Sequence, residues 1–172
     1  MKVFIISGER GEGKTTFLKK AIKELHLRKR NIYGFYAENI KDDSDKEGYR
    51  IYDVSHSSSL LLCKRNAPET GSLNLLEFWF NEDVIVSGEQ WLRKGFYKDY
   101  PVFVLDEVGK FELDGFVWDS ILKQILKQNS GTLIITVRNR FVKKVMEKYQ
   151  LNSHNLITQE NLLFTIEFVD KI

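Results

Sequence analysis

The sequence predicts a three-layer α/β fold, in which a mainly parallel β-sheet lies between two layers of helices. Apolar, β-branched runs typical of buried strands alternate along the chain with segments whose apolar residues recur at helical spacing. The first run, Lys2–Ser7, leads through a glycine-rich loop directly into a helix. Strands that are joined through helices pair in parallel by right-handed crossovers. We therefore expect residues 1–172 to form a single domain of this kind, with one added β-hairpin.

The remaining elements follow from the same patterns. A polar turn at Lys41–Gly48 separates two strand-like runs and predicts a hairpin with an acidic tip. The tip contains Asp42, Asp43 and Asp45, but no calcium-loop pattern follows, so a solvated turn is favoured over a cation site. Strands are expected at Lys2–Ser7, Asn31–Glu38, Tyr49–Val54, Leu60–Cys63, Leu75–Phe80, Tyr100–Leu105, Thr132–Val137 and Leu162–Val169. Helices are expected from Lys14, from a capping box at Ser87–Gln90, over Leu113–Gln128, and over Phe141–Tyr149.

The loop after the first strand matches the phosphate-binding pattern G-x-x-x-x-G-K-[ST] at Gly8, Gly13, Lys14 and Thr15. Glycines allow successive backbone N–H groups to point at a phosphate chain, and the positive N-terminal end of the next helix attracts the same anion. Lys14 is expected to bridge the outer phosphates, and the Thr15 hydroxyl to bind Mg²⁺. A glycine-rich turn without a ligand is the alternative, and the flanking strand and helix favour a true phosphate loop. The candidate nucleotide-binding residues are Gly8, Glu9, Arg10, Gly11, Glu12, Gly13, Lys14, Thr15 and Thr16.

Two of these loop residues are acidic, which is unusual for an anion-binding loop. We predict that the side chains of Glu9 and Glu12 point outward and that Arg10 partly offsets their charge.

A second motif ends the strand at Val102–Leu105, where Asp106 and Glu107 follow four apolar residues. This is the Walker B arrangement, in which a buried strand delivers a carboxylate to Mg²⁺. Asp106 is the predicted metal ligand, and Glu107 is predicted to polarise a water that attacks the γ-phosphate. Two acids that end a strand at the surface are the alternative. The pattern D-x-x-G of GTPases also fits at Asp106–Gly109, but no N-K-x-D guanine-binding motif follows, so guanine specificity is unsupported.

The segment Asp106-Glu107-Val108-Gly109-Lys110-Phe111-Glu112-Leu113 resembles the D-E-I-G-K-M-E-L box of the thermophile-type nucleoside-triphosphatases, also called cancer-related nucleoside-triphosphatases. Gly34-Phe35-Tyr36-Ala37-Glu38 is similar to a second segment of that family, G-F-Y-T-x-E. The resemblance implies a RecA-like P-loop NTPase that uses Mg²⁺ to hydrolyse ATP, GTP and other nucleoside triphosphates to diphosphate and phosphate, with low base specificity. It also implies that Gly109, Lys110 and Glu112 lie near the site.

Transition-state charge on the γ-phosphate normally requires a further cation. The candidates are Lys110, which the family box supports as a catalytic residue, together with Arg138 and Arg140. The strand Thr132–Val137 is expected to end beside the phosphates, which makes Thr136 a candidate polar sensor and Arg138 a candidate charge stabiliser. For each arginine a solvated position at the rim is the alternative.

Composition restricts the remaining classes of function. A net charge of +2, with 42% hydrophobic and 29% charged residues, gives no argument for nucleic acid or an anionic membrane. Cys63 is the single cysteine, which excludes an internal disulfide and a thiolate metal cluster. Aromatics at Phe78–Phe80 near Lys64 and Arg65 are better explained by core packing than by single-stranded nucleic acid. No apolar run approaches the ~20 residues of a membrane span, and Met1 leads directly into a strand, so we expect a cytoplasmic protein.

Three classes of function remain: a hydrolase that uses water, a kinase that passes the γ-phosphate to a nucleoside or small molecule, and a nucleotide-dependent switch. Glu107 beside Asp106 favours the hydrolase. The kinase is the leading alternative, because the hairpin around Lys41–Gly48 could close over a second substrate. The sequence leaves the oligomeric state open, a monomer included.

Overall fold

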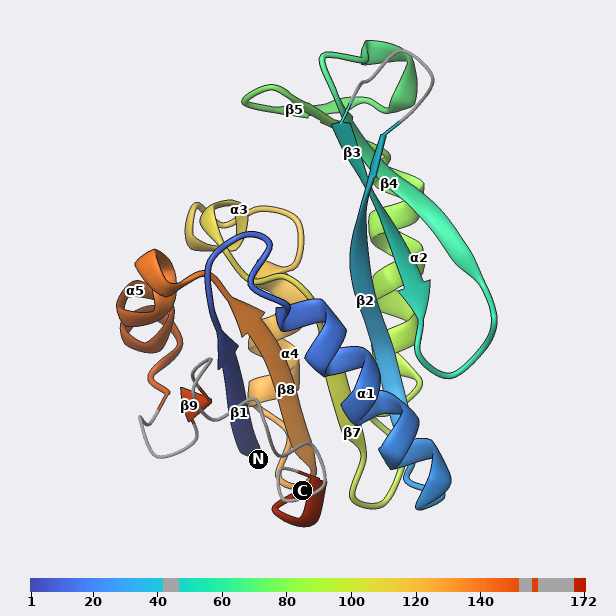
Figure 1. Ribbon diagram of the computed structural model, residues 1–172, viewed down its shortest axis with the longest axis vertical. Helices are drawn as coiled ribbons and strands as arrows, with labels where there is room; N and C mark the ends of the chain where they lie inside the picture. Colours follow the sequence, from blue (N-terminus) through green and yellow to red (C-terminus); the bar gives the residue numbers. More distant parts are fainter. Residues whose placement is uncertain (42–46, 152–155, 158–168) are drawn as a thin grey trace.

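The computed structural model describes residues 1–41, 47–151, 156–157 and 169–172. Over these residues nine strands form one sheet in the order β5-β6-β4-β3-β2-β7-β8-β1-β9 (Figure 1). Helices cover both faces of this sheet, which confirms the predicted three-layer α/β fold. In the described part of the chain, no helix is long and apolar enough to span a membrane.

The parallel half of the sheet brings the functional loops to one edge. Strand β1 (Lys2–Ser7) pairs with β8 (Thr132–Val137) over its whole length and with β9 (Leu156–Ile157), and β8 pairs in turn with β7 (Val102–Leu105). All these pairs are parallel, so the strands end at the same edge, which is where ligands bind in open α/β sheets. The phosphate loop follows β1, the acid pair follows β7, and Arg138 follows β8.

The other half of the sheet is an antiparallel extension that rises above the parallel half (Figure 1). Its base is β2 (Ile32–Lys41), which pairs in parallel with β7 at its start and continues past the end of β7 to pair with β3 (Glu47–Asp53). The predicted hairpin is therefore confirmed, whereas its tip with Asp42, Asp43 and Asp45 lies outside the described residues. The extension is completed by β4 (Ser59–Arg65), β6 (Phe78–Phe80) and β5 (Leu73–Leu75), with a short 3-10 helix at Pro68–Thr70.

The single strand predicted at Leu75–Phe80 is wrong, because the segment forms the two arms of a tight hairpin. Leu76 has a φ of 59°, a left-handed conformation that ends β5 and reverses the chain into β6. Its side chain is 62% exposed, so no burial holds it in a strand. Strand β4 continues to Arg65, two residues past the predicted end at Cys63, and the chain turns at Asn66, which has a φ of 49°.

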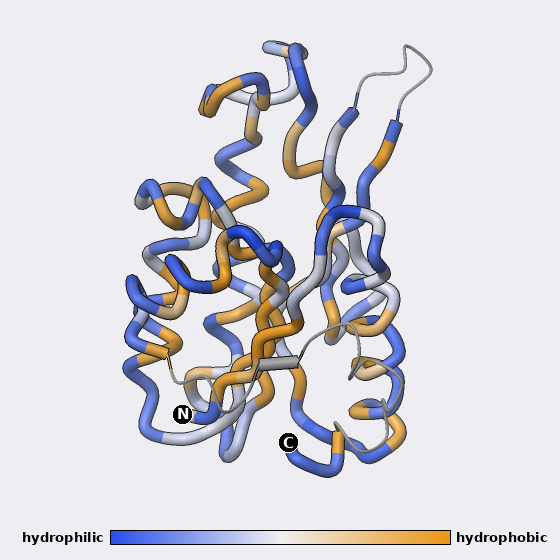
Figure 2. The backbone as a smooth tube through the Cα atoms, turned by 60° about the vertical axis from the view of Figure 1, so that its left-hand side comes forward, coloured by the Kyte–Doolittle hydropathy of each residue, from blue (hydrophilic) through white to orange (hydrophobic). Residues whose placement is uncertain are grey.

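The two faces of the sheet carry separate layers of core. Helix α1 (Lys14–Leu27) packs its apolar face on Phe4 and Ile6 of β1, whereas Ile5 points to the opposite face. That opposite face is covered by α2 (Glu82–Arg93), α4 (Asp119–Leu126) and α5 (Asn139–Tyr149), whose buried residues join one cluster. Apolar residues follow the central strands in Figure 2, as expected for a sheet buried on both faces.

Two helix predictions are corrected by local geometry. The helix expected to open at Ser87 begins five residues earlier, because Asn81 is its N-cap and accepts a hydrogen bond from the N–H of Val84 at 3.3 Å. Ser87 lies inside the helix and donates instead to the carbonyl of Asp83 at 2.8 Å.

The helix expected over Leu113–Gln128 is two helices, α3 (Lys110–Leu113) and α4. The connection between them contains Gly115 and Val117 with φ of 92° and 49°, conformations that interrupt a right-handed helix. The break places α3 directly after Gly109, so that the family box itself forms a helical turn at the site. Of the final strand expected at Leu162–Val169, residues 162–168 lie outside the described residues, and Val169 is helical and buried.

Candidate active site

The phosphate loop joins β1 to α1 and is shaped by two glycines. Gly11 and Gly13 have φ of 84° and 85°, a left-handed conformation that costs glycine little, and Gly13 is the N-cap of α1. Lys14 follows at the first position of the helix and is 6% exposed. Its Nζ donates a hydrogen bond to the carbonyl of Glu9 at 2.9 Å, so the ammonium lies over the loop.

The charged residues of the loop are arranged differently from the prediction. The Glu12 carboxylate does not point outward, because it accepts a hydrogen bond from the N–H of Glu9 at 2.6 Å. A loop of inward-facing N–H groups attracts the nearest anion, and here that anion is its own carboxylate. Arg10 does not offset the loop acids as predicted, because its guanidinium forms an ion pair with Glu47 on β3. This ion pair ties the phosphate loop to the antiparallel extension.

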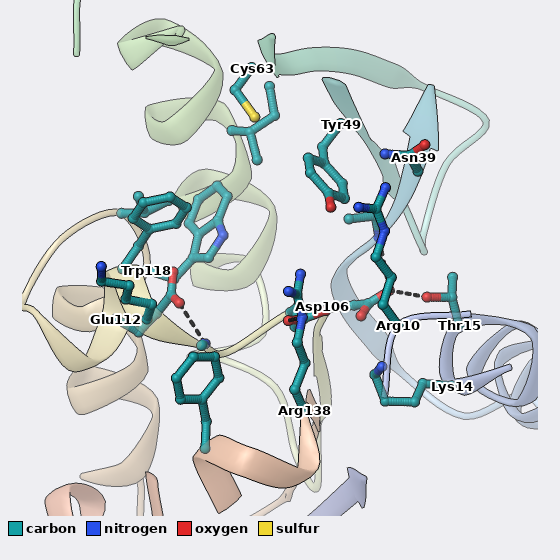
Figure 3. A pocket seen from close by; sticks show the side chains of 18 of the residues that line it. Arg10, Lys14, Thr15, Asn39, Tyr49, Cys63, Asp106, Glu112, Trp118 and Arg138 are labelled. Atoms are coloured by element: carbon teal, nitrogen blue, oxygen red, sulfur yellow. Dashed lines mark hydrogen bonds and ion pairs between the residues drawn. The ribbon is translucent and has the colours of Figure 1, made fainter. Parts of the chain in front are cut away.

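Asp106 lies at the point where four segments meet (Figure 3). Its carboxylate is 3% exposed and accepts hydrogen bonds from the Thr15 hydroxyl and the Ala37 N–H, both at 3.1 Å, and from the Thr136 hydroxyl. Burial raises the pKa of Asp106, whereas these hydrogen bonds and the charge of Lys14 act in the opposite direction. The predicted metal ligands Thr15 and Asp106 are thus brought into contact, although they are 91 positions apart in the sequence.

These two residues fit a Mg²⁺ ion. Mg²⁺ prefers oxygen ligands and is usually held by one or two carboxylates, with substrate phosphates and water completing its shell. The Thr15 hydroxyl and the Asp106 carboxylate are the ligands that a protein would supply to such an ion. Among the described residues, no group of three or more His, Cys, Asp or Glu side chains could hold a metal without a substrate.

Glu107 lies beside Asp106, and its side chain is 30% exposed. The Nε of Arg138 lies 2.7 Å from Glu107 Oε1, so the end of β8 supplies a cation to the acid pair. Burial raises the pKa of Glu107, and the positive charge of Arg138 opposes that rise. Of the other candidate cations, Lys110 and Arg140 are exposed, and Arg140 lies over the ring of Phe141 at 4.8 Å. Arg138 is therefore the cation that the structure brings to Glu107.

Glu112 forms the capping interaction that starts α3. Its carboxylate accepts a hydrogen bond from the N–H of Gly109 at 2.8 Å, and it is 3% exposed. From α5, the Tyr149 hydroxyl and the Lys148 ammonium donate to the main-chain carbonyl of Glu112. Burial raises the pKa of Glu112 to about 7, and the nearby charge of Glu107 acts in the same direction. Glu112 therefore positions the turn that carries Gly109 and Lys110.

This buried acid predicts a pH-dependent stability. The pKa of Glu112 is about 7 in the folded protein, compared with an ordinary value of 4.5. At a pH between these two pKa values the folded protein binds more protons than the unfolded chain, so the free energy of unfolding falls as the pH rises from 4.5 to about 7. Between pH 5 and 8 the free energy of unfolding of the wild type should fall by about 2 to 3 kcal/mol relative to Glu112→Gln. Urea unfolding of both proteins at each pH measures the difference, and parallel curves would contradict the raised pKa.

A cavity of about 440 Å³ connects all these groups. Glu107, Gly109 and Lys110 lie along the cavity, and one end of it is lined by phosphate-loop residues: Arg10, Gly11, Gly13, Lys14, Thr15 and Thr16. Sequence reasoning singles out only Phe78–Phe80 at the other end, and assigns these aromatics to core packing. The remaining residues come from distant segments whose apolar patterns resemble ordinary core. We call this end the aromatic chamber, and it is lined by Leu62, Cys63, Phe78, Phe80, Phe111 and Trp118.

Comparison with known proteins shows the family of the chain. A family model described as NTPase matches residues 3–163. The nucleoside-triphosphatase THEP1 of Aquifex aeolicus is 30% identical over 152 residues, which cover 86% of this chain and 83% of that protein. The protein of the same name from Saccharolobus solfataricus is 26% identical over 140 residues, or 81% of this chain and 78% of that protein.

Solved structures show the same fold. The crystal structure of THEP1 from Aquifex aeolicus has a TM-score of 0.71 at 20% identity and covers 98% of both chains. The solution structure of a human cancer-related nucleoside triphosphatase has a TM-score of 0.72 at 17% identity, and covers 99% of this chain and 97% of that one. The family match extends over most of the chain and confirms the family that the sequence resembles: this chain belongs to the NTPase family of nucleoside-triphosphatases.

Proposed function

We propose that this protein hydrolyses nucleoside 5′-triphosphates, ATP and GTP included, to nucleoside diphosphate and phosphate in a Mg²⁺-dependent reaction with low base specificity. The observation that carries the proposal is the contact of Thr15 with Asp106 at 3.1 Å, directly beside the pair of Glu107 and Arg138. A phosphate loop, two metal ligands, an acid and a cation thus share one cavity. The family relatives are named nucleoside-triphosphatases, which supports the same reaction class.

Binding of the triphosphate relies on groups that do not contact the base. The backbone N–H groups of the loop and the N-terminus of α1 receive the phosphates, and Lys14 reaches the outer two. Nucleotide binding displaces the Lys14 ammonium from the carbonyl of Glu9 and the Glu12 carboxylate from the N–H of Glu9. The loop N–H groups and Lys14 would contact only phosphate oxygens of the nucleotide, which supports a low base specificity.

Thr15 and Asp106 would hold Mg²⁺, which would supply positive charge that stabilises the triphosphate. Asp106 is fixed for this task by the hydrogen bonds from Ala37 and Thr136. Glu107 accepts the proton of the attacking water and orients that water in line with the leaving oxygen. Arg138, held at 2.7 Å from Glu107, stabilises the negative charge that develops on the transferred phosphoryl group.

The proposal predicts phosphate release from ATP, GTP, CTP and UTP at comparable rates, and loss of release when EDTA removes Mg²⁺. The measurement is a phosphate-release assay on the four nucleotides at equal concentration, with and without Mg²⁺. Asp106→Asn should abolish the effect of Mg²⁺, because the remaining amide is a poor ligand for a hard cation. Release from one nucleotide alone would contradict low base specificity, and release from none would overturn the proposed function.

A further inference from the structure

The aromatic chamber is a feature that hydrolysis by water does not use. Its walls come from β4, β6 and α3 and from Trp118 at the start of α4, and they are closely packed: the ring of Phe111 lies 5.1 Å from that of Phe80 in an edge-to-face arrangement. Trp118 is 2% exposed and Cys63 is 1% exposed. The whole cavity, with the phosphate end included, has a volume of about 440 Å³, in the range of small-molecule sites.

The chamber lies at the end of the cavity that the γ-phosphate faces. Figure 3 shows Lys14 and Thr15 on one side, Trp118 and Cys63 on the other, and Asp106 and Arg138 between them. In a phosphate loop the lysine and the metal meet the β- and γ-phosphates, and the nucleoside extends from the opposite end of the phosphate chain. The γ-phosphate would therefore separate the nucleoside from the chamber, which makes the chamber a place for a second molecule.

Two ion pairs link the chamber wall to the phosphate loop. Arg10 of the loop forms an ion pair with Glu47 of β3, and Glu47 also lies 3.4 Å from Arg65 of β4. β4 carries Leu62 and Cys63 into the chamber. The antiparallel extension is thereby attached to the same loop that would hold the nucleotide.

The chemistry of the wall indicates which molecule fits. Apart from Glu112, the charged residues of the cavity lie at its phosphate end or on its rim, and the six residues that define the chamber are all uncharged. Burial raises the pKa of Glu112 to about 7, so its carboxyl is mostly protonated only below neutral pH, and it is already engaged with the N–H of Gly109. Aromatic walls favour a flat ring, which can pack against Phe111 and Phe78 edge to face or offset. The occupant that fits is an uncharged aromatic compound.

We propose that the aromatic chamber binds an uncharged aromatic alcohol and that its hydroxyl replaces water as acceptor of the γ-phosphate. The inference rests on the proposed function, because it uses the same bound triphosphate and the same acid. The alcohol oxygen forms a bond to the γ-phosphorus while the bond from that phosphorus to the β–γ bridging oxygen breaks. The nucleoside diphosphate leaves with the electron pair, and Glu107 takes the hydroxyl proton. The products are a phosphate monoester and a nucleoside diphosphate.

The test is a transfer assay with ATP labelled at the γ-phosphate, in Mg²⁺, with benzyl alcohol, 2-phenylethanol, adenosine or thymidine as acceptor. Glycerol serves as a control that has hydroxyl groups but no aromatic ring. Mass spectrometry and chromatography separate the labelled ester from free phosphate. We expect ester from at least one aromatic alcohol, with a matching decrease in free phosphate, and none from glycerol.

Two phenylalanines of the same segment provide matched variants. Phe111 lines the chamber, whereas Phe116, five positions later, is 46% exposed and does not line the cavity. Phe111→Ala should lower the ratio of ester to free phosphate by about tenfold or more, because it removes the ring on which the acceptor packs. Phe116→Ala should leave that ratio unchanged. Thermal unfolding of both variants, and the conservative Phe111→Leu, separate loss of acceptor packing from loss of folding.

The two readouts test the inference and the proposed function separately. Phosphate release without any alcohol tests hydrolysis alone, whereas ester formation tests the chamber. Failure to form ester with every aromatic alcohol, or equal transfer to glycerol, would overturn the inference and leave hydrolysis standing. If Phe111→Ala instead changed the KM for ATP and GTP unequally, the chamber would hold the nucleotide base, and the inference would again be wrong.

Discussion

Replacing Glu107 with Gln is expected to lower kcat for nucleotide hydrolysis by about 10² to 10⁴-fold, the usual contribution of a general base. The amide has nearly the same shape as the carboxylate but cannot accept the proton of the attacking water. Nucleotide affinity should change little, because the phosphate loop, Lys14 and the predicted metal ligands are untouched. Single-turnover phosphate release measures the rate, and equilibrium titration with a fluorescent nucleotide measures the affinity.

A matched control for this variant is Glu112→Gln, which changes an acid of the same type five positions away. The Glu112 carboxylate accepts a hydrogen bond from the N–H of Gly109 and holds the first turn of α3, whereas the Glu107 carboxylate forms an ion pair with Arg138. A glutamine at position 112 can still accept the hydrogen bond from the N–H of Gly109, so we expect a much smaller loss of kcat at neutral pH. Comparable losses in both variants would show that Glu107 has no special part in activating water.

Replacing Arg138 with Ala is the second large effect, with an expected decrease in kcat of about 10³ to 10⁵-fold, as for other cations that stabilise a transferring phosphoryl group. Arg138 is fixed at the end of β8 and lies 2.7 Å from Glu107, so its loss removes charge from the reacting end of the cavity. Because its expected role is confined to the transition state, kcat should fall far more than nucleotide affinity. Steady-state kinetics with ATP, combined with nucleotide titration, measures both quantities.

Arg140 provides the comparison for Arg138. It lines the same cavity but is exposed and lies over the ring of Phe141. Arg140→Ala should therefore reduce kcat by less than about tenfold, as expected for a rim charge that is screened by water. Arg138→Lys should restore part of the activity lost in Arg138→Ala, because a positive charge remains. Equal losses at positions 138 and 140 would mean that no single arginine is the stabilising cation.

Much of the parallel sheet could be predicted from the sequence because its signals are local. The strands Lys2–Ser7 and Thr132–Val137 have the predicted bounds, since both are continuous apolar runs buried on two faces. The errors arose where a local signal was ambiguous. The pattern of Leu75–Phe80 predicts one strand, because nothing in it indicates the turn at Leu76. The pattern of Leu113–Gln128 predicts one helix, because nothing in it indicates the left-handed conformation of Val117.

Short sequence motifs were enough to predict the chemistry of the phosphate end. The spacing of Gly8, Gly13, Lys14 and Thr15 and the acid pair after an apolar strand are properties of short segments, and a short segment carries its own backbone geometry. The same holds for the family, because the Asp106–Leu113 box is contiguous. These motifs identify a nucleoside-triphosphatase before any contact between them is known.

How these segments combine becomes visible only in the folded chain. The contacts between Thr15 and Asp106 and between Glu107 and Arg138 bring together residues from different strands, and the parallel sheet aligns those strands at one edge. Likewise, the hydrogen bond that the Glu12 carboxylate accepts from the N–H of Glu9 depends on the folded path of the loop. The aromatic chamber forms because β2 continues beyond β7 and pairs there with the antiparallel extension. Such contacts depend on the path of the whole chain, so no local pattern could have specified them.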